Sequence, residues 1–185
     1  MALKSTIFKA GLQIADMDRG YYRDHALTLA RHPSETDERM MVRLLAFALH
    51  AGDALAFGTG LSTGDEPDLW RRDLTGDIEE WIDVGLPDEK RLRKACGRAA
   101  AVHVYAYGGR AADVWWRQNG GALARLDRLR VVNLPLAATQ ALGALAARTM
   151  QLQATIQDGQ AWLADDKTAV QVDLQWLQGT PAAAR

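Results

Sequence analysis

Two carboxylates between Asp65 and Cys96 have the types and spacing that metal-assisted phosphodiester hydrolysis requires. Asp68 directly follows Pro67, and Asp83 lies fifteen residues later, near the end of the next apolar run. That separation is enough for one short strand, a turn and a second strand, so the acids can lie on neighbouring strands. Mg²⁺ or Mn²⁺ held by such carboxylates lowers the pKa of bound water and offsets charge on a phosphate. The pair therefore predicts a Mg²⁺ or Mn²⁺ site at Asp68 and Asp83.

Both acids also have structural interpretations. Asp68 follows a proline in a loop that leads into a strand, a place where Asp is common because it favours turns. Asp83 lies on a strand beside Trp81, and a half-buried acid there requires a partner of some kind. The residues alone leave the metal-binding and structural interpretations open.

A run of basic residues directly after Asp83 could bind phosphate. The run consists of Lys90, Arg91, Arg93, Lys94 and Arg98. Such a run usually forms a solvated helix face, and the alternative is a patch that contacts DNA or RNA phosphates. Arg110, just after two glycines, could likewise reach a phosphate or pair with Asp113. Because the net charge is −1 and the pI is about 6.4, nucleic-acid binding would depend on such a local patch.

Other residues that could do chemistry have simpler interpretations. His103 lies in an apolar strand and is expected to be a hydrogen-bonded interior residue, and Cys96 is expected in the core. Trp115 and Trp116 point about 100° apart on a helix, so we expect one in the core and the other over an edge or as a stacking surface for bases. No Cys/His spacing suggests zinc, and no nucleotide loop or catalytic triad pattern is found.

The elements that position these residues follow from hydrophobic periodicity and turn residues. Residues 3–15 predict a strand, and 21–31 predict the second arm of a hairpin or, alternatively, a helix. Ser34 is the predicted N-cap of a helix that ends at Gly52. The elements predicted next are strands at 55–61, 68–74 and 78–85, a helix at 88–98, a strand at 101–107, a helix at 110–119, a strand at 129–134 and a helix at 136–147.

The patterns further predict how these elements connect. Asp83 should point away from the side of its strand that carries Ile82 and Val84. Residues 101–134 should form a parallel strand–helix–strand crossover. Residues 148–177 predict an antiparallel meander that can join the N-terminal hairpin.

Composition indicates one globular domain spanning residues 1–185. The chain is 48% hydrophobic and 24% charged, which is ordinary for a globular domain of this length. Its single cysteine fits a reducing compartment, and no apolar run reaches membrane-spanning length or forms a signal-peptide core. The expected location is the cytoplasm.

The predicted order over residues 34–107, helix, three strands, helix and strand, resembles the αβββαβ core of the PD-(D/E)XK nuclease-like superfamily. The whole chain also resembles the YaeQ family, a variant of that superfamily. The resemblance is carried by MALKSTIFKA, LTLARHPSETDERMMVRLLAF, EEWIDVGLPDEKRLRKAC, RAADVWWRQN and RTMQLQATIQDGQAWL. It implies an α/β fold with a mixed central sheet and this restriction endonuclease-like core, edged by antiparallel hairpins from both termini.

The resemblance also implies roles for particular residues. Asp68 matches the Pro-Asp position of the superfamily and Asp83 the first acid of its (D/E)XK motif. The motif lysine is replaced here by Gly85, and a lysine from the following helix, Lys94 in preference to Lys90, would take its place. A first-helix acid, Glu38 or Glu35, would support the metal.

Three functions follow from these expectations. The first is a Mg²⁺-dependent nuclease that uses Asp68, Asp83, Lys94 and Glu38. The second is a degenerate relative that no longer cuts and binds nucleic acid or a protein, in transcription or repair, with Lys90, Arg91, Lys94 and Arg110 as the contacting residues. The third is a protein-binding scaffold.

Overall fold

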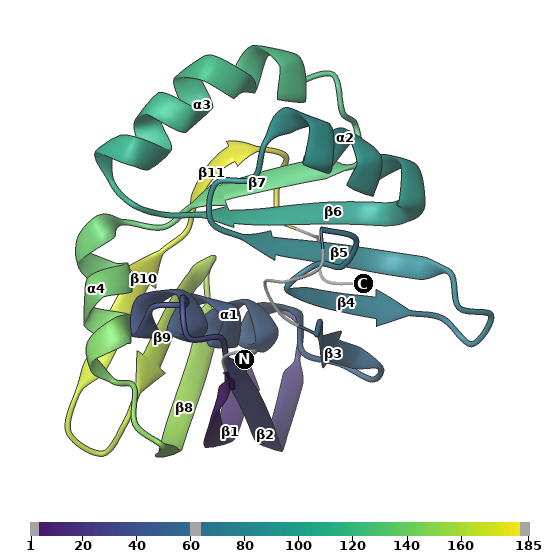
Figure 1. Cartoon of the computed structure of the whole chain (residues 1–185). Coiled ribbons are helices and arrows are strands. Elements are labelled where there is room, and N and C mark those ends of the chain that lie inside the picture. The colour runs from purple at the N-terminus through teal and green to yellow at the C-terminus, as the bar shows by residue number, and fades with distance from the viewer. Residues whose placement is uncertain (1–3, 60–63, 182–185) are drawn as a thin grey trace.

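A computed structural model describes residues 4–59 and 64–181, and in these ranges the chain forms four helices and eleven strands (Figure 1). The elements are β1 (Thr6–Asp16), β2 (Tyr21–Arg31), α1 (Asp37–His50), β3 (Leu55–Phe57), β4 (Leu69–Arg72), β5 (Ile78–Val84), α2 (Glu89–Arg98), β6 (Ala99–Ala106), α3 (Arg110–Leu123), β7 (Leu129–Asn133), α4 (Leu136–Ala144), β8 (Thr149–Gln157), β9 (Gln160–Ala164), β10 (Ala169–Asp173) and β11 (Gln175–Gln178). Within those ranges, no helix is both long enough and apolar enough to cross a membrane.

The strands form two mixed sheets with helix α1 between them. The five-stranded sheet has the order β10-β9-β8-β1-β2, and the six-stranded sheet has the order β11-β7-β6-β5-β4-β3. Residues Met40 to Ala48 of α1 are all buried, and they share one core with residues from both sheets. Because residues all around this helix are buried, it needs cover on every side, and one sheet could not have buried α1 alone.

This requirement explains the main correction to the predicted fold. The terminal hairpins do not edge the central sheet; they build the second sheet, in which β1 pairs with β2 antiparallel and with β8 parallel. The prediction that the C-terminal meander joins the N-terminal hairpin is confirmed. The last strand of the meander region, β11, returns instead to the six-stranded sheet and pairs with β7.

A second core lies on the other face of the six-stranded sheet, beneath α2 and α3. Leu92 of α2 and Trp115 of α3 are buried against β5, β6 and β7. Strand β5 is therefore covered on both faces. Ile82 and Val84 contact the α1 side, and Trp81 contacts the α2 side. The prediction that Asp83 points away from Ile82 and Val84 is thus confirmed, as is the parallel β6–α3–β7 crossover.

Residues 21–31 form the second arm of the hairpin, as predicted, and not the alternative helix; they pair with β1 along its whole length. Several other predicted element boundaries were wrong. The N-cap of α1 is Thr36, whose side chain accepts the Arg39 N–H, while Ser34 bonds to His32.

Other boundaries shift at the helix and strand ends. Helix α3 continues past two glycines to Leu123, because burying Leu123 outweighs their low helix propensity. Helix α4 ends at Ala144 instead of 147. The strand predicted over 68–74 covers Leu69–Arg72. That predicted over 55–61 is Leu55–Phe57, and residues 60 and 61 of it, like residue 3 of the first strand, lie outside the described residues.

Candidate functional site

The structure brings Asp68 and Asp83 together at the C-terminal end of β5. Leu69 pairs with Ile82 in the antiparallel β4–β5 ladder, which sets the two acids on neighbouring segments. Asp83 is buried and Asp68 is half-buried. Burial raises the pKa of Asp68; Arg39 counteracts this and the nearby charge of Asp83 adds to it. The two carboxylates therefore lie near each other, as predicted.

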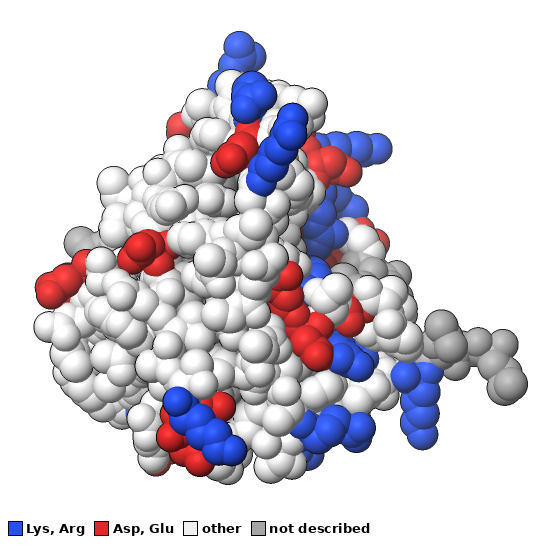
Figure 2. Space-filling view, turned by 90° about the vertical axis from the view of Figure 1, so that its left-hand side faces the viewer, with Lys and Arg blue, Asp and Glu red and all other residues white. Residues whose placement is uncertain are grey.

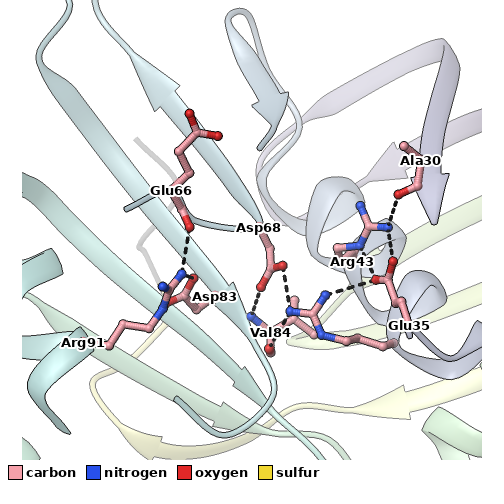
Figure 3. A network of polar contacts seen from close by, with 9 residues as sticks. Ala30, Glu35, Arg43, Glu66, Asp68, Asp83, Val84 and Arg91 are labelled. Atoms are coloured by element: carbon pink, nitrogen blue, oxygen red, sulfur yellow. Dashed lines mark hydrogen bonds and ion pairs between the residues drawn. The ribbon is translucent and has the colours of Figure 1, made fainter. Parts of the chain in front are cut away.

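The carboxylate of Asp83 is bound by the guanidinium group of an arginine and is not free to bind a metal. Arg91 of α2 donates from Nε to Oδ2 at 2.8 Å and from Nη2 to Oδ1 at 2.9 Å (Figure 3). The same side chain donates to the backbone carbonyls of Gly64 and Glu66 at 3.0 and 2.8 Å. Asp88 caps α2 by accepting the Arg91 N–H, which fixes the start of the helix beside Asp83. The pKa of Arg91 is raised, chiefly by its hydrogen bonds to Asp83.

Asp68 also has both carboxylate oxygens occupied. Arg39 Nη2 donates to Oδ1 at 2.7 Å, and the backbone N–H of Val84 donates to Oδ2 at 2.8 Å. The other arm of Arg39 reaches Glu35 Oε1 at 3.1 Å. Arg39 therefore connects the acid near β4 to the acid that precedes α1.

Glu35 completes a row of alternating charges that Figure 3 shows from close by. Arg43 forms a two-point contact with Glu35, at 2.7 Å from Nε to Oε1 and 2.8 Å from Nη2 to Oε2, and both residues are buried. Arg43 Nη2 also donates to the carbonyl of Ala30 at 3.1 Å. We call Glu35, Arg39, Arg43, Asp68, Asp83 and Arg91 the acid–arginine cluster. Its three acids are balanced by three arginines.

The cluster leaves little room for the chemistry predicted from the sequence. Mg²⁺ prefers six oxygen ligands at about 2.0–2.1 Å. All four carboxylate oxygens of Asp68 and Asp83 already accept a hydrogen bond. A metal ion would have to displace Arg39 or Arg91, each of which makes several other hydrogen bonds.

The structure places three of the predicted site residues elsewhere than expected. Lys94 is exposed and its Nζ lies 2.5 Å from Asp65 Oδ1, because Arg91 in the first turn of α2 takes the place beside the acids. Glu38 accepts a hydrogen bond from the Thr139 hydroxyl at 2.7 Å, in the contact between α1 and α4. Of the two first-helix acids considered, Glu35 is the one that joins Asp68. Arg91, predicted to contact nucleic acid, is instead engaged with Asp83.

A second group of polar side chains lies on the α1 side of the six-stranded sheet, the face opposite to Asp83. It consists of His50, the last residue of α1, Glu80 of β5 and His103 of β6, and we call it the His–Glu cluster. Glu80 Oε1 lies 3.4 Å from His50 Nδ1 and 3.5 Å from His103 Nε2. One potential ligand atom from each residue lies within 4.8 Å of the other two. His50 and His103 are mostly buried, and their rings meet edge to face.

Two further side chains hold this cluster in place. The Tyr105 hydroxyl lies 2.7 Å from His50 Nε2, and Arg71 Nη1 lies 3.2 Å from Glu80 Oε2. Burial, together with repulsion from His103, lowers the pKa of His50 to about 4. Burial raises the pKa of Glu80, but the imidazoles of His103 and His50 lower it by more, so that it falls below its usual range. Burial also raises the pKa of Tyr105, so that it stays protonated near neutral pH.

Sequence reasoning missed His50 and Glu80, and it missed the arginines of the first helix. The i, i+4 spacing of Glu35 and Arg39 was a signal for an ion pair. Glu80 has the same strand parity as Ile82, which faces the α1 side, so its burial on that side was also readable. The parallel register that sets Ile82 beside His103 was not readable from either strand alone. His103 is interior, as predicted, but its Nε2 has no hydrogen-bond partner among the described residues.

Comparison with known sequences identifies similar proteins over almost the whole chain. The family model described as YaeQ protein matches residues 1–174. The YaeQ proteins of Escherichia coli strain K12 and Shigella flexneri are each 50% identical to this chain over 179 residues. Each of these alignments covers 96% of this chain and 99% of the relative.

Solved structures of two similar proteins have the same fold. The YaeQ protein from Xanthomonas axonopodis pv. citri is 55% identical, with a TM-score of 0.92 over 95% of this chain and 99% of that one. The YaeQ protein from Pseudomonas syringae is 38% identical, with a TM-score of 0.92 over 96% of this chain and 98% of that one. The two-sheet arrangement described above is thus shared with crystal structures of these relatives.

Proposed function

The chain belongs to the YaeQ family, and we propose that it binds nucleic acid through the outer surface of α2 and α3 without cutting it. The element order α1-β3-β4-β5-α2-β6, with β3, β4 and β5 antiparallel and β6 parallel to β5, supports a nuclease-like core. On this proposal the nuclease-like core positions the helices that bind nucleic acid and no longer supplies a catalytic site.

A strong asymmetry of charge along the chain carries the proposal. Residues 88–130 contain ten Lys and Arg but only four Asp and Glu, a net charge of +6, although the whole chain has a net charge of −1. The exposed basic residues of this segment form what we call the basic helix surface: Lys90, Arg93, Lys94, Arg98, Arg110, Arg117, Arg125 and Arg128. A concentration of positive charge on one face is the electrostatic feature expected of a surface that binds phosphates.

The packing of α2 and α3 turns these basic side chains outward together. Both helices bury apolar residues against the same face of the six-stranded sheet, and Trp115 Nε1 donates to the carbonyl of Pro87 at 2.8 Å between them. Figure 2 shows several Lys and Arg side chains projecting from the top of the molecule, where these helices lie in Figure 1. Lys94 pairs with Asp65 and Arg93 with Glu89, but exposed pairs of this kind are weak and can be exchanged for phosphates.

Binding without cutting follows from the acid–arginine cluster. Arg91 and Arg39 cover the carboxylates that a nuclease would use for its metal, and Lys94 points away from them. A phosphate on the basic helix surface would therefore meet no activated water at these acids.

Salt-dependent binding tests the proposal. The affinities of short labelled duplex DNA, single-stranded DNA and RNA would be measured by fluorescence anisotropy between about 50 and about 200 mM salt. The triple variant Lys90→Ala, Lys94→Ala, Arg110→Ala should lower the slope of log K against log salt by about 2 to 3, roughly one for each phosphate that the variant no longer neutralises.

The matched control removes three exposed basic residues from the five-stranded sheet and its turns, in the variant Lys9→Ala, Arg23→Ala, Lys167→Ala. It has the same net charge as the first variant, so a general charge effect would weaken both equally. Equal weakening of the two variants, or no binding by the unmodified chain, would overturn the proposal.

Mg²⁺-dependent cleavage is the second candidate function, and one observation favours it. The negative charges of Asp68 and Asp83 lie near enough to repel each other. A divalent cation bound between them would reduce that repulsion. The same nucleic acids incubated with Mg²⁺ or Mn²⁺ distinguish the two functions. We expect no cleavage. Cleavage that disappears in Asp83→Asn would establish the nuclease.

A further inference from the structure

The His–Glu cluster has the composition of a transition-metal site, separate from both the basic helix surface and the acid–arginine cluster. Two imidazoles and one carboxylate are the protein ligands found in zinc sites that keep a fourth position for water. We propose that His50, Glu80 and His103 bind one divalent transition-metal ion of the zinc class. The nitrogen ligands favour such a metal over Mg²⁺, which prefers oxygen ligands alone.

The spacing of the three ligand atoms fits an ion better than it fits direct hydrogen bonds. Zinc binds nitrogen and carboxylate oxygen at about 2.0–2.1 Å, so two ligands of a tetrahedral ion lie roughly 3.3–3.4 Å apart. The distances from Glu80 Oε1 to His50 Nδ1 and His103 Nε2 are 3.4 and 3.5 Å. Good N–H···O hydrogen bonds are shorter, at about 2.7–3.2 Å. The two imidazole nitrogens lie within 4.8 Å of each other, and they would have to move closer together to share the ion.

Unsatisfied polar atoms point to the same conclusion. His103 is only 6% exposed, and its Nε2, the atom aimed at Glu80, has no hydrogen-bond partner among the described residues. Glu80 Oε2 likewise has no hydrogen-bond partner in that part of the chain, although Arg71 lies within ion-pair distance. A buried polar atom left unpaired lowers stability, and coordination to a metal by Nε2 would remove that cost at His103.

Tyr105 and Arg71 are arranged as the outer partners that orient metal ligands. The Tyr105 oxygen can accept the Nε2–H of His50, which leaves the Nδ1 lone pair directed toward Glu80 Oε1. Arg71 lies beside the outer oxygen, Oε2, so that Oε1 faces both imidazoles. Tyr105 is thus a positioning residue for this site and need not contact the metal.

Calorimetric titration with Zn²⁺ tests the inference. The chain carries no polyhistidine tag and is first dialysed against a chelator. We expect one Zn²⁺ per chain. Glu80→Gln and His103→Gln should each weaken binding by more than about 100-fold, beyond the range of 10- to 100-fold that is typical when an outer partner is removed. Tyr105→Phe should weaken binding within that range, because His50 loses the partner that fixes its tautomer.

A matched control and a spectroscopic readout keep the result interpretable. His32→Gln alters a histidine away from the site, which bonds to Ser34, and should leave Zn²⁺ affinity unchanged. Co²⁺ should give the intense visible absorption of a four-coordinate site in the unmodified chain and lose it in Glu80→Gln. Should His103→Gln fail to fold, Glu80→Gln carries the test. The inference is overturned if Zn²⁺ does not bind, or if Glu80→Gln binds it as tightly as the unmodified chain.

Discussion

Strand β5 carries Asp83 on one face and Glu80 on the other, and the surroundings of these two carboxylates differ. Asp83 receives two hydrogen bonds from Arg91 at 2.8 and 2.9 Å. Glu80 faces two imidazoles at 3.4 and 3.5 Å and one arginine in poor hydrogen-bond geometry. Asp83 is buried and Glu80 is half-buried, and an unpaired polar atom in such a place is costly. A carboxylate with hydrogen bonds to both oxygens, like Asp83, serves to stabilise the fold. A carboxylate that lacks some of its hydrogen bonds, like Glu80, can still bind a ligand.

The same contrast extends to the groups around each acid. The acid–arginine cluster has one arginine for each acid, so its charges are balanced without a metal. In the His–Glu cluster the His50 imidazole is neutral near neutral pH, because burial lowers its pKa to about 4. Neutral imidazole is the form that binds metals.

The largest expected effect is on stability, from opening the acid–arginine cluster. Arg91→Ala leaves the Asp83 carboxylate buried and without its cation, so we expect the free energy of unfolding to fall by about 3–5 kcal/mol in urea denaturation. Arg93→Ala, which removes the partner of Glu89 from the exposed side of the same helix, should cost no more than about 1 kcal/mol. If the two variants lose the same stability, the cluster does not serve the structural role assigned to it.

A somewhat smaller effect is expected from acidifying the metal-free chain. His50 has a pKa of about 4 in the folded state against an ordinary value of 6.5. Between these values the unfolded chain binds a proton that the folded chain does not, so the free energy of unfolding should fall as the pH is lowered from 6.5 to 4. The loss attributable to His50 is about 3 kcal/mol.

The variant His50→Gln isolates this contribution from other groups that titrate in the same range. Urea denaturation at several pH values, with chelator present, should show a flatter pH dependence for His50→Gln than for the unmodified chain. His32→Gln should keep the original dependence. A slope unchanged by His50→Gln would show that this imidazole is not neutral and buried in the folded chain.

The smallest expected effect concerns Lys94. Because its pair with Asp65 is exposed, Lys94→Ala should change the free energy of unfolding by no more than about 1 kcal/mol. It should still reduce the salt slope of nucleic-acid binding by about one. A large loss of stability instead would mean that Lys94 belongs to the interior cluster after all.

The sequence allowed much of the fold to be predicted where a local pattern decided it. Alternation placed Asp83 opposite Ile82 and Val84, and glycine-bounded runs identified the β6–α3–β7 crossover. The second sheet was not predictable locally, since it depends on the all-round burial of α1 by strands from both ends of the chain.

The candidate site was predictable only in part, for a related reason. Proline and periodicity correctly predicted that Asp68 and Asp83 lie together, but the types and spacing of the acids suggested a metal as their partner, and the arginines were not foreseen. Which cation reaches an acid depends on helix placement: Asp88 caps α2 so that Arg91, and not Lys94, lies beside Asp83. The His–Glu cluster depends on the parallel register of β5 and β6 and on where α1 ends, neither of which shows in the spacing of the histidines.

Anomalous diffraction from crystals soaked separately in Zn²⁺ and in Mn²⁺ tests the difference between the two faces of β5 most directly. The account predicts a Zn²⁺ peak among His50, Glu80 and His103, and no Mn²⁺ peak between Asp68 and Asp83, with Arg91 still on Asp83. A Mn²⁺ ion between the two aspartates with Arg91 displaced, together with an empty His–Glu cluster, would contradict it.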